Sequence, residues 1–251
     1  MPTPKPRYPR RPSITSQVEK QIKKSNPSME FAFVKVPKEK IKPVYEAQFK
    51  NKVIINEKKT KKYLADILRR KYTEAKKTGK YKTWLKYIKK EQSLNEIHTH
   101  HITENIMPSA RDITRLFLKS EYGTQNLSAT ILQNNNGKIE GRLQYIVNSK
   151  KIPKELKEKL IEFNNKLIKA EKSENLDLFS EIYKSIMDFV RGYRSKIITK
   201  IQTDSYLGFI KEPETNADYH IQCLNKMGLI IHFIPTKGYV FDKERMKFIK
   251  K

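Results

Sequence analysis

Residues 153–196 read PKELKEKLIEFNNKLIKAEKSENLDLFSEIYKSIMDFVRGYRSK and carry two helical patterns of apolar residues in succession. In each half, the apolar side chains recur mostly every three or four positions, as one face of an α-helix requires. Residues 171–175 are polar and separate the halves. The stretch therefore predicts an αα-hairpin that serves as a scaffold for the fold. Its apolar positions are Leu156, Leu160, Phe163 and Leu167, followed by Leu178, Ile182, Ile186, Phe189 and Val190.

Upstream of this hairpin, residues 57–92 also show helical spacing, with Leu64, Ile67 and Leu68 in the first part. Gly79 is expected to separate two helices there. Residues 29–56 are richer in alternating apolar residues and predict short strands, which prolines interrupt.

Residues 109–133 predict two short helices around a glycine turn. Ser109 is a suitable cap for the first helix. Leu127, Ile131 and Leu132 would lie on the second, and the pair is compatible with a helix-turn-helix. The following Asn-Gly of residues 134–137 favours a tight turn and a hairpin.

These elements predict an α+β fold that is mostly helical. We expect residues 1–28 to form an extended, basic, proline-rich arm and residues 29–148 to form a basic α+β unit. Residues 149–251 would form the helical hairpin and a winged-helix-like end.

Charge is the strongest indication of function. The chain has 53 Lys and Arg against 27 Asp and Glu, a net charge of +26 over 251 residues. Residues 35–90 hold twenty basic and five acidic residues, so more than half of the net charge lies there. Such a charge favours a polyanionic partner, above all a nucleic acid, whose phosphates bind Lys and Arg with release of counterions. An anionic membrane surface or an acidic protein would also satisfy it.

The candidate nucleic-acid-binding residues form three groups. The arm begins MPTPKPRYPRRP, in which five prolines impose an extended path on a basic segment. The second group lies in the basic helical stretch, and the third lies near the C-terminus. The candidates are Arg7, Arg10 and Arg11; then Lys58, Lys59, Lys61, Lys62, Arg69, Arg70, Lys71, Lys76 and Lys77; then Gln222, Asn225, Lys226 and Lys237.

Residues 216–241 read NADYHIQCLNKMGLIIHFIPTKGYVF and resemble the last helix and wing of a winged-helix domain. Thr215 or Asn216 would cap the helix and Gly228 would end it. Residues 229–233 and 239–241 would be the two strands of the wing. The resemblance implies that Tyr219, His220, Gln222 and Asn225 face bases and that Lys226 and Lys237 face phosphates.

No pattern in the chain predicts catalysis or a cofactor. Phosphate-cradling glycine loops and the Gly-x-Ser-x-Gly elbow are absent from the sequence. His98, His100 and His101 form the only histidine cluster, without a Cys pair or a His-Glu-x-x-His helix beside it. We therefore interpret this segment as a polar loop, and expect no metal site and no enzymatic activity.

The sequence thus favours a non-enzymatic protein that binds RNA or DNA as a structural component of a large nucleoprotein assembly, such as a ribosome-like particle or a virion. Other proteins of that assembly would be further partners. The alternative is a winged-helix DNA-binding regulator or replication factor. We expect an intracellular protein without a membrane span, because the chain has one cysteine, Cys223, and lacks a long apolar run.

Overall fold

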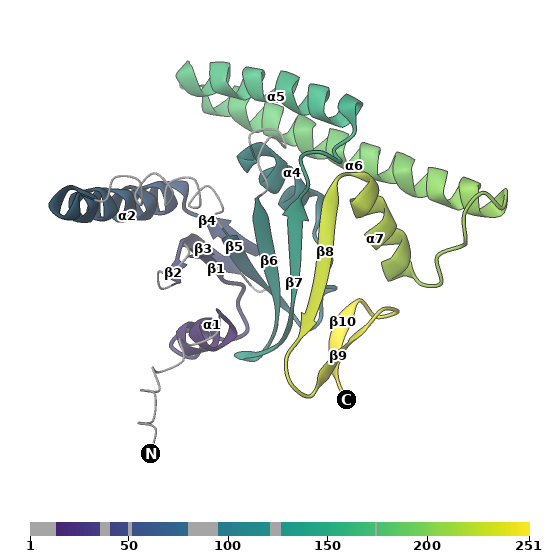
Figure 1. Ribbon diagram of the computed structural model, residues 1–251, viewed down its shortest axis with the longest axis horizontal. Helices are drawn as coiled ribbons and strands as arrows, with labels where there is room; N and C mark the ends of the chain where they lie inside the picture. Colours follow the sequence, from purple (N-terminus) through teal and green to yellow (C-terminus); the bar gives the residue numbers. More distant parts are fainter. Residues whose placement is uncertain (1–13, 36–40, 50–51, 80–94, 121–126, 174) are drawn as a thin grey trace.

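The computed structural model describes residues 14–35, 41–49, 52–79, 95–120, 127–173 and 175–251 (Figure 1). The expected α+β class is confirmed, and about half of the described residues are helical and about a quarter lie in strands. In chain order the elements are α1 (Ile14–Ile22), β1 (Ala32–Lys35), β2 (Lys42–Pro43), β3 (Tyr45–Phe49), β4 (Lys52–Ile55), α2 (Glu57–Thr78), β5 (Asn95–His101), α4 (Ala110–Lys119), β6 (Ser128–Asn135), β7 (Lys138–Val147), α5 (Lys154–Lys172), α6 (Leu176–Tyr206), α7 (Asn216–Lys226), β8 (Leu229–Pro235), β9 (Tyr239–Asp242) and β10 (Lys247–Lys250).

A six-stranded mixed sheet forms the centre of the fold, in the order β2-β1-β5-β6-β7-β8. Strands β5 and β6 are parallel, and every other neighbouring pair is antiparallel. Parallel neighbours need a crossover connection, and α4 lies between β5 and β6 in the chain. The turn predicted at residues 134–137 joins β6 to β7, with Asn136 and Gly137 at φ 48° and 90°. Positive φ at both central residues is the reason Asn-Gly is favoured there.

The second short helix predicted around Leu127, Ile131 and Leu132 is wrong, because residues 128–135 form β6. Six consecutive residues of this strand are buried. Ile131 packs into the largest core on one face of the sheet, and Leu132 packs into a second core on the other. A strand covered on both faces loses the polar alternation that would distinguish it from a buried helix.

The predicted αα-hairpin is confirmed as α5 and α6, and α6 continues to Tyr206, beyond the expected end. Figure 1 shows the pair crossing the end of the sheet toward which β7 points. Leu156 and Leu160 of α5 and Ile186 and Val190 of α6 are fully buried in the largest core. This core also takes side chains from α4, α7, β6 and β7, so it includes residues on both sides of position 148.

Helix α1 covers part of the opposite face of the sheet. Val18 and Ile22, four positions apart, are fully buried with Phe31 and Phe33. Residues 14–22 are therefore helical, and not extended as expected for the whole arm of residues 1–28, because these two apolar side chains pack on the sheet. Residues 1–13 of the arm, with Arg7, Arg10 and Arg11, lie outside the described residues.

The C-terminal segment has the predicted helix and strands but a different strand pairing. The Thr215 hydroxyl caps α7 by accepting from the N–H of Asp218, and Gly228 follows the helix at φ 87°. Strand β8 pairs with β7 as part of the large sheet, and β9 pairs with β10. Among the described residues, the pairing of 229–233 with 239–241 that the expected wing requires is therefore absent, and β8 is an edge strand of the large sheet.

Among the described residues, no helix has both the length and the apolar character that crossing a membrane requires.

Gly141 of β7 lies directly under the ring of Phe248 from β10. A Cβ atom at position 141 would lie 2.3 Å from a Phe248 ring carbon, and Phe248 is 1% exposed. We predict that Gly141→Ala lowers the free energy of unfolding by about 1–3 kcal/mol, because the ring must move within a packed core. Gly192→Ala is the matched control, since its Cβ meets nothing within 4 Å on helix α6. It should raise stability by about 1 kcal/mol in the same denaturant titration. Equal effects of the two substitutions would contradict the packing described here.

Candidate functional site

Helix α2 carries the basic stretch that the sequence identified. Asn56 caps its start by accepting from the N–H of Lys59 at 2.8 Å, and Gly79 ends it at φ 66°. The second helix expected after Gly79, within residues 80–92, lies outside the described residues. Ile67 and Ala75 are buried on one side of the helix. Lys62, Arg69 and Lys76 are exposed at intervals of seven residues, which is nearly two helical turns, so they follow one line along the outer face. The helix is amphipathic, with its cations directed to solvent.

The structure places the predicted basic residues of α2 as follows. Lys59, Lys62, Arg69, Arg70, Lys76 and Lys77 are exposed, and Lys58 and Lys61 belong to the same helix. Lys71 is half-buried and pairs with Glu74 at 3.3 Å, and the Lys59 ammonium donates to the Tyr45 carbonyl oxygen at 3.4 Å. In the described part of the chain, Lys62, Arg69, Lys76 and Lys77 form no ion pair. Their charged groups therefore face solvent without an acidic partner among the described residues.

The candidates near the C-terminus lie apart from α2: Figure 1 shows α2 beyond one edge of the sheet, whereas α7 lies beside β8 at the opposite edge. Asn225, Lys226 and Lys237 are exposed. Gln222 is half-buried and lines a hollow of about 260 Å³ whose other residues include three acids. That lining consists of Lys211, Glu212, Pro213, Glu214, Asp218, Ile221, Gln222 and Lys243.

His220, which the resemblance would direct toward bases, is half-buried and contacts helix α6. Its Nδ1 lies 2.9 Å from an Arg194 guanidinium nitrogen on α6, and burial lowers the pKa of His220. The exposed Asn225 and Lys226 lie at the C-terminal end of α7, whereas Glu212, Glu214 and Asp218 lie around its start.

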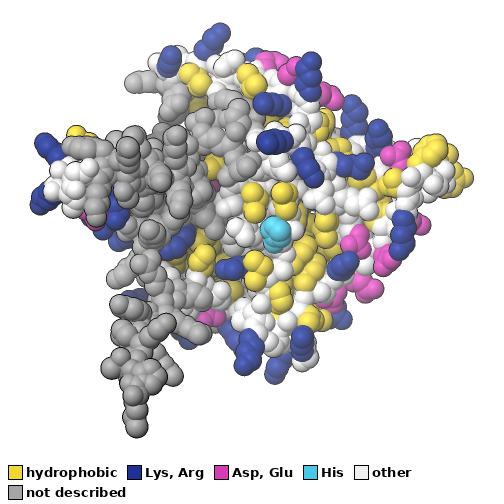
Figure 2. Space-filling view, viewed as in Figure 1, with side chains coloured by type: hydrophobic (Ala, Val, Ile, Leu, Met, Phe, Trp, Pro, Cys, Tyr) yellow, Lys and Arg dark blue, Asp and Glu magenta, His cyan; other side chains and the backbone are white. Residues whose placement is uncertain are grey.

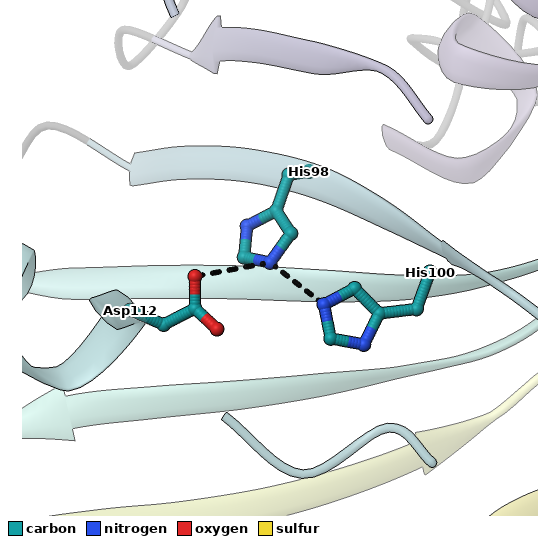
Figure 3. Close-up of side chains that lie close together, drawn as sticks. All are labelled: His98, His100 and Asp112. Atoms are coloured by element: carbon teal, nitrogen blue, oxygen red, sulfur yellow. Dashed lines mark hydrogen bonds and ion pairs between the residues drawn. The ribbon is translucent and has the colours of Figure 1, made fainter. Parts of the chain in front are cut away.

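A third group of polar side chains lies where the sequence predicted a loop. Residues 95–101 form β5, so the loop assignment for His98, His100 and His101 is wrong. Alternate residues of a strand point to the same side of a sheet. His98 and His100 consequently lie together above the sheet, and Asp112 from α4 faces them (Figure 3). The loop assignment failed because Ile97 is the one apolar residue of 95–101, and its companion on the buried side is the polar Thr99, so the sequence shows no apolar alternation.

These three side chains are in contact. The Nε2 atoms of His98 and His100 lie 3.1 Å apart, and His98 Nε2 lies 3.5 Å from Asp112 Oδ1 (Figure 3). The other carboxylate oxygen, Oδ2, accepts from the N–H and the hydroxyl of Ser109 at 2.8 and 2.7 Å, which completes the predicted cap of α4. One carboxylate thus joins the start of α4 to the histidines of β5.

Burial dominates the electrostatics of this group. It lowers the pKa of His98 to about 4, although the Asp112 carboxylate opposes that shift. Burial would raise the pKa of Asp112, but the two imidazoles and the hydrogen bonds from Ser109 hold that pKa below its usual range. Burial also raises the pKa of Glu30 to about 8, and the nearby carboxylates of Glu104 and Asp112 act in the same direction.

Two sets of described residues offer ligand atoms within 4.8 Å of one another: His98, His100 and Asp112, and Glu30, His100 and Glu104. Sequence reasoning missed both sets. The available signal was the His-x-His spacing, which places two imidazoles on one face if the segment is a strand. No sequence pattern places Glu30 or Asp112 near that strand. Glu30 comes close because β1 pairs with β5, and Asp112 comes close because the start of α4 packs beside β5.

The guanidinium of Arg115 binds Glu96 next to this group. Arg115 Nε and one terminal nitrogen contact the two carboxylate oxygens at 2.9 and 3.4 Å, and both side chains are largely buried. We predict that Arg115→Met lowers the free energy of unfolding by about 1–3 kcal/mol, because Glu96 keeps a largely buried charge without this guanidinium. Arg191→Met breaks the exposed ion pair with Asp188. This substitution should change the free energy of unfolding by less than about 0.5 kcal/mol. Chemical denaturation of both variants gives the comparison, and an Arg115→Met variant as stable as the Arg191→Met control would rule out the buried pair as a stabilising contact.

Comparison with models of protein families, with curated proteins and with solved structures found no match for this chain. The winged-helix resemblance of residues 216–241 consequently stays a prediction. A functional proposal for this chain draws on its own charges, exposed side chains and contacts.

Proposed function

We propose that this chain is a non-enzymatic nucleic-acid-binding protein that serves as a structural component of a large nucleoprotein assembly. The observation that carries the proposal is the net charge of +26, part of which lies on the exposed face of helix α2. Repulsion among so many cations disfavours a compact chain unless a polyanion neutralises them.

Helix α2 supports this function with nine Lys and Arg against three Asp and Glu over 22 residues. Its inner face is held by Ile67 and Ala75, so the helix can present its cations without losing its packing. Further Lys and Arg side chains are scattered over the molecular face in Figure 2, without one dominant groove among the visible atoms. Diffuse charge of this kind suits contacts with many phosphates and carries no sequence information.

RNA and DNA both offer the phosphates that these cations would bind. Other proteins of the assembly would cover the remaining surface. An intracellular location is part of the proposal, since the single Cys223 is buried and free.

The alternative function is that of a DNA-binding regulator or replication factor that uses α7. The exposure of Asn225 and Lys226 favours it, because an Asn side chain can form paired hydrogen bonds with adenine. The acids around Gln222 weigh against it, since Glu212, Glu214 and Asp218 surround the start of the helix. We therefore prefer binding that is independent of sequence.

The first test is the salt dependence of binding. With on the order of 6–10 phosphate contacts, affinity for an unstructured RNA or a random duplex should fall by about 10³–10⁵ between 50 and 200 mM salt. Replacing Lys62, Arg69 and Lys76 together by Gln should reduce the slope of log affinity against log salt by about 3, one for each lost phosphate contact.

The matched control replaces Lys172, Lys184 and Lys200, exposed on α5 and α6, by Gln and so removes the same charge. It should change the slope by less than half as much. A flat salt response in the unmodified protein would refute nucleic-acid binding, and equal effects of the two triple variants would refute the role of α2.

The second test addresses α7. We predict that selection from random duplexes returns no preferred site, and that Gln222→Ala and Asn225→Ala leave duplex affinity nearly unchanged. If α7 reads bases, each substitution should instead cost about 1–3 kcal/mol against the selected site and little against random DNA. Lys237→Ala, which removes an exposed cation, should weaken binding to both DNAs equally. One clear motif that Gln222→Ala abolishes would favour the regulator function over ours.

A further inference from the structure

The group formed by His98, His100 and Asp112 has the dimensions of a metal site. Two ligands of one zinc ion, each about 2.0–2.1 Å from it in tetrahedral geometry, lie about 3.3–3.4 Å from one another. The observed separations are 3.1 Å between the two Nε2 atoms and 3.5 Å from His98 Nε2 to Asp112 Oδ1. All three ligand atoms lie within 4.8 Å of one another, so one ion can reach them with small side-chain adjustments.

The orientation of His100 also suits a metal ligand. Its Nδ1 lies 3.0 Å from the carbonyl oxygen of Asn105, which can only accept a hydrogen bond. Nδ1 is therefore the donor, and in the neutral imidazole Nε2 carries the lone pair. That lone pair is on the side of His98 (Figure 3). A backbone carbonyl that fixes the ring and its tautomer is the usual second partner of a metal-binding histidine.

The charge around the group favours a cation, although the chain as a whole is strongly basic. Asp112, Glu104 and Glu30 are all close to His100, and Glu30 is only 5% exposed. The guanidinium of Arg115 is directed to Glu96. Buried carboxyl groups are costly unless a charge or hydrogen bonds compensate them, and a divalent ion would compensate several at once.

We propose that β5 and α4 hold one divalent transition-metal ion, with His98 Nε2, His100 Nε2 and Asp112 Oδ1 as its protein ligands. Two imidazoles select ions such as Zn²⁺ or Co²⁺ over Mg²⁺ and Ca²⁺, which prefer oxygen ligands. Three protein ligands leave a coordination position open to water or to a further ligand. The carboxylates of Glu30 and Glu104, whose oxygens lie within 4.8 Å of a His100 ring nitrogen, are candidates for that further ligand. The proposal is independent of nucleic-acid binding.

The test is a titration of the full chain with ZnCl₂ by calorimetry, and with CoCl₂ by visible absorption. We expect one high-affinity equivalent per chain, which MgCl₂ at the same concentration does not displace. His98→Gln and His100→Gln should each weaken Zn²⁺ binding by on the order of 100-fold, because a direct ligand contributes at least as much as the outer partners of such sites.

His101→Gln is the matched control, because His101 belongs to the same strand but its Nδ1 contacts the Thr103 hydroxyl at 3.0 Å. It should bind Zn²⁺ like the unmodified protein, and so should a variant of the exposed His232 of β8. The absence of a one-to-one complex would overturn the proposal, as would a loss of affinity in His101→Gln equal to that in His98→Gln.

X-ray absorption of the Zn²⁺-loaded, unmodified protein keeps the proposal testable even if the histidine variants fail to fold. Two imidazoles and at least one oxygen around the ion would support it. A sulfur ligand, which only Cys223 or a methionine could supply, or a single imidazole would overturn it.

Discussion

Coverage of the central sheet on both faces is the constraint on which the rest of this fold depends. Strand β6 is buried on each side, so the chain must supply apolar side chains to two cores. Helix α1 provides them on one face, while α4, α5, α6 and α7 provide them on the other. The parallel pairing of β5 with β6 adds a second requirement, because it needs a crossover connection. Helix α4 lies in that connection, and its first turn brings Asp112 to the histidines of β5.

The distribution of charge follows from the same arrangement. Burial of the sheet uses the apolar side chains, so the excess Lys and Arg remain on outer helix faces such as that of α2. In contrast, carboxyl groups gather close to the sheet around His98 and His100. A basic exterior and an acidic interior group can coexist because solvent and salt screen the surface cations from the buried site. The two proposed properties of the protein thus belong to separate regions with opposite electrostatics.

Local signals in the sequence predicted local structure well. The caps at Ser109 and Thr215, the glycine that ends α2 and the Asn-Gly turn were all correct, since each depends on a few neighbouring residues. The αα-hairpin was also correct, because a helix with one exposed face keeps its periodicity.

Pairing between distant segments could not be predicted in the same way. Apolar and polar residues do not alternate along β6, because both of its faces are buried. The residues around β8 do not decide whether it pairs with β7 or with β9. The histidine group was missed for the same reason. Its members lie on β5 and α4, and Glu30 comes close only because β1, which follows it in the chain, pairs with β5. Its two histidines could have been placed together from their spacing, but only after β5 was recognised as a strand.

The Asp112 carboxylate has two functions, and this has a thermodynamic consequence. Oδ2 accepts the hydrogen bonds that begin α4, while Oδ1 faces His98. A change in either interaction alters the position or the charge distribution of the Asp112 carboxylate, on which the other interaction depends. A double-mutant cycle between Ser109 and His98, which contact different oxygens of the same Asp112 carboxylate, should therefore give a coupling energy different from zero. Helix initiation and the chemistry of the histidine pair are linked quantities in this protein.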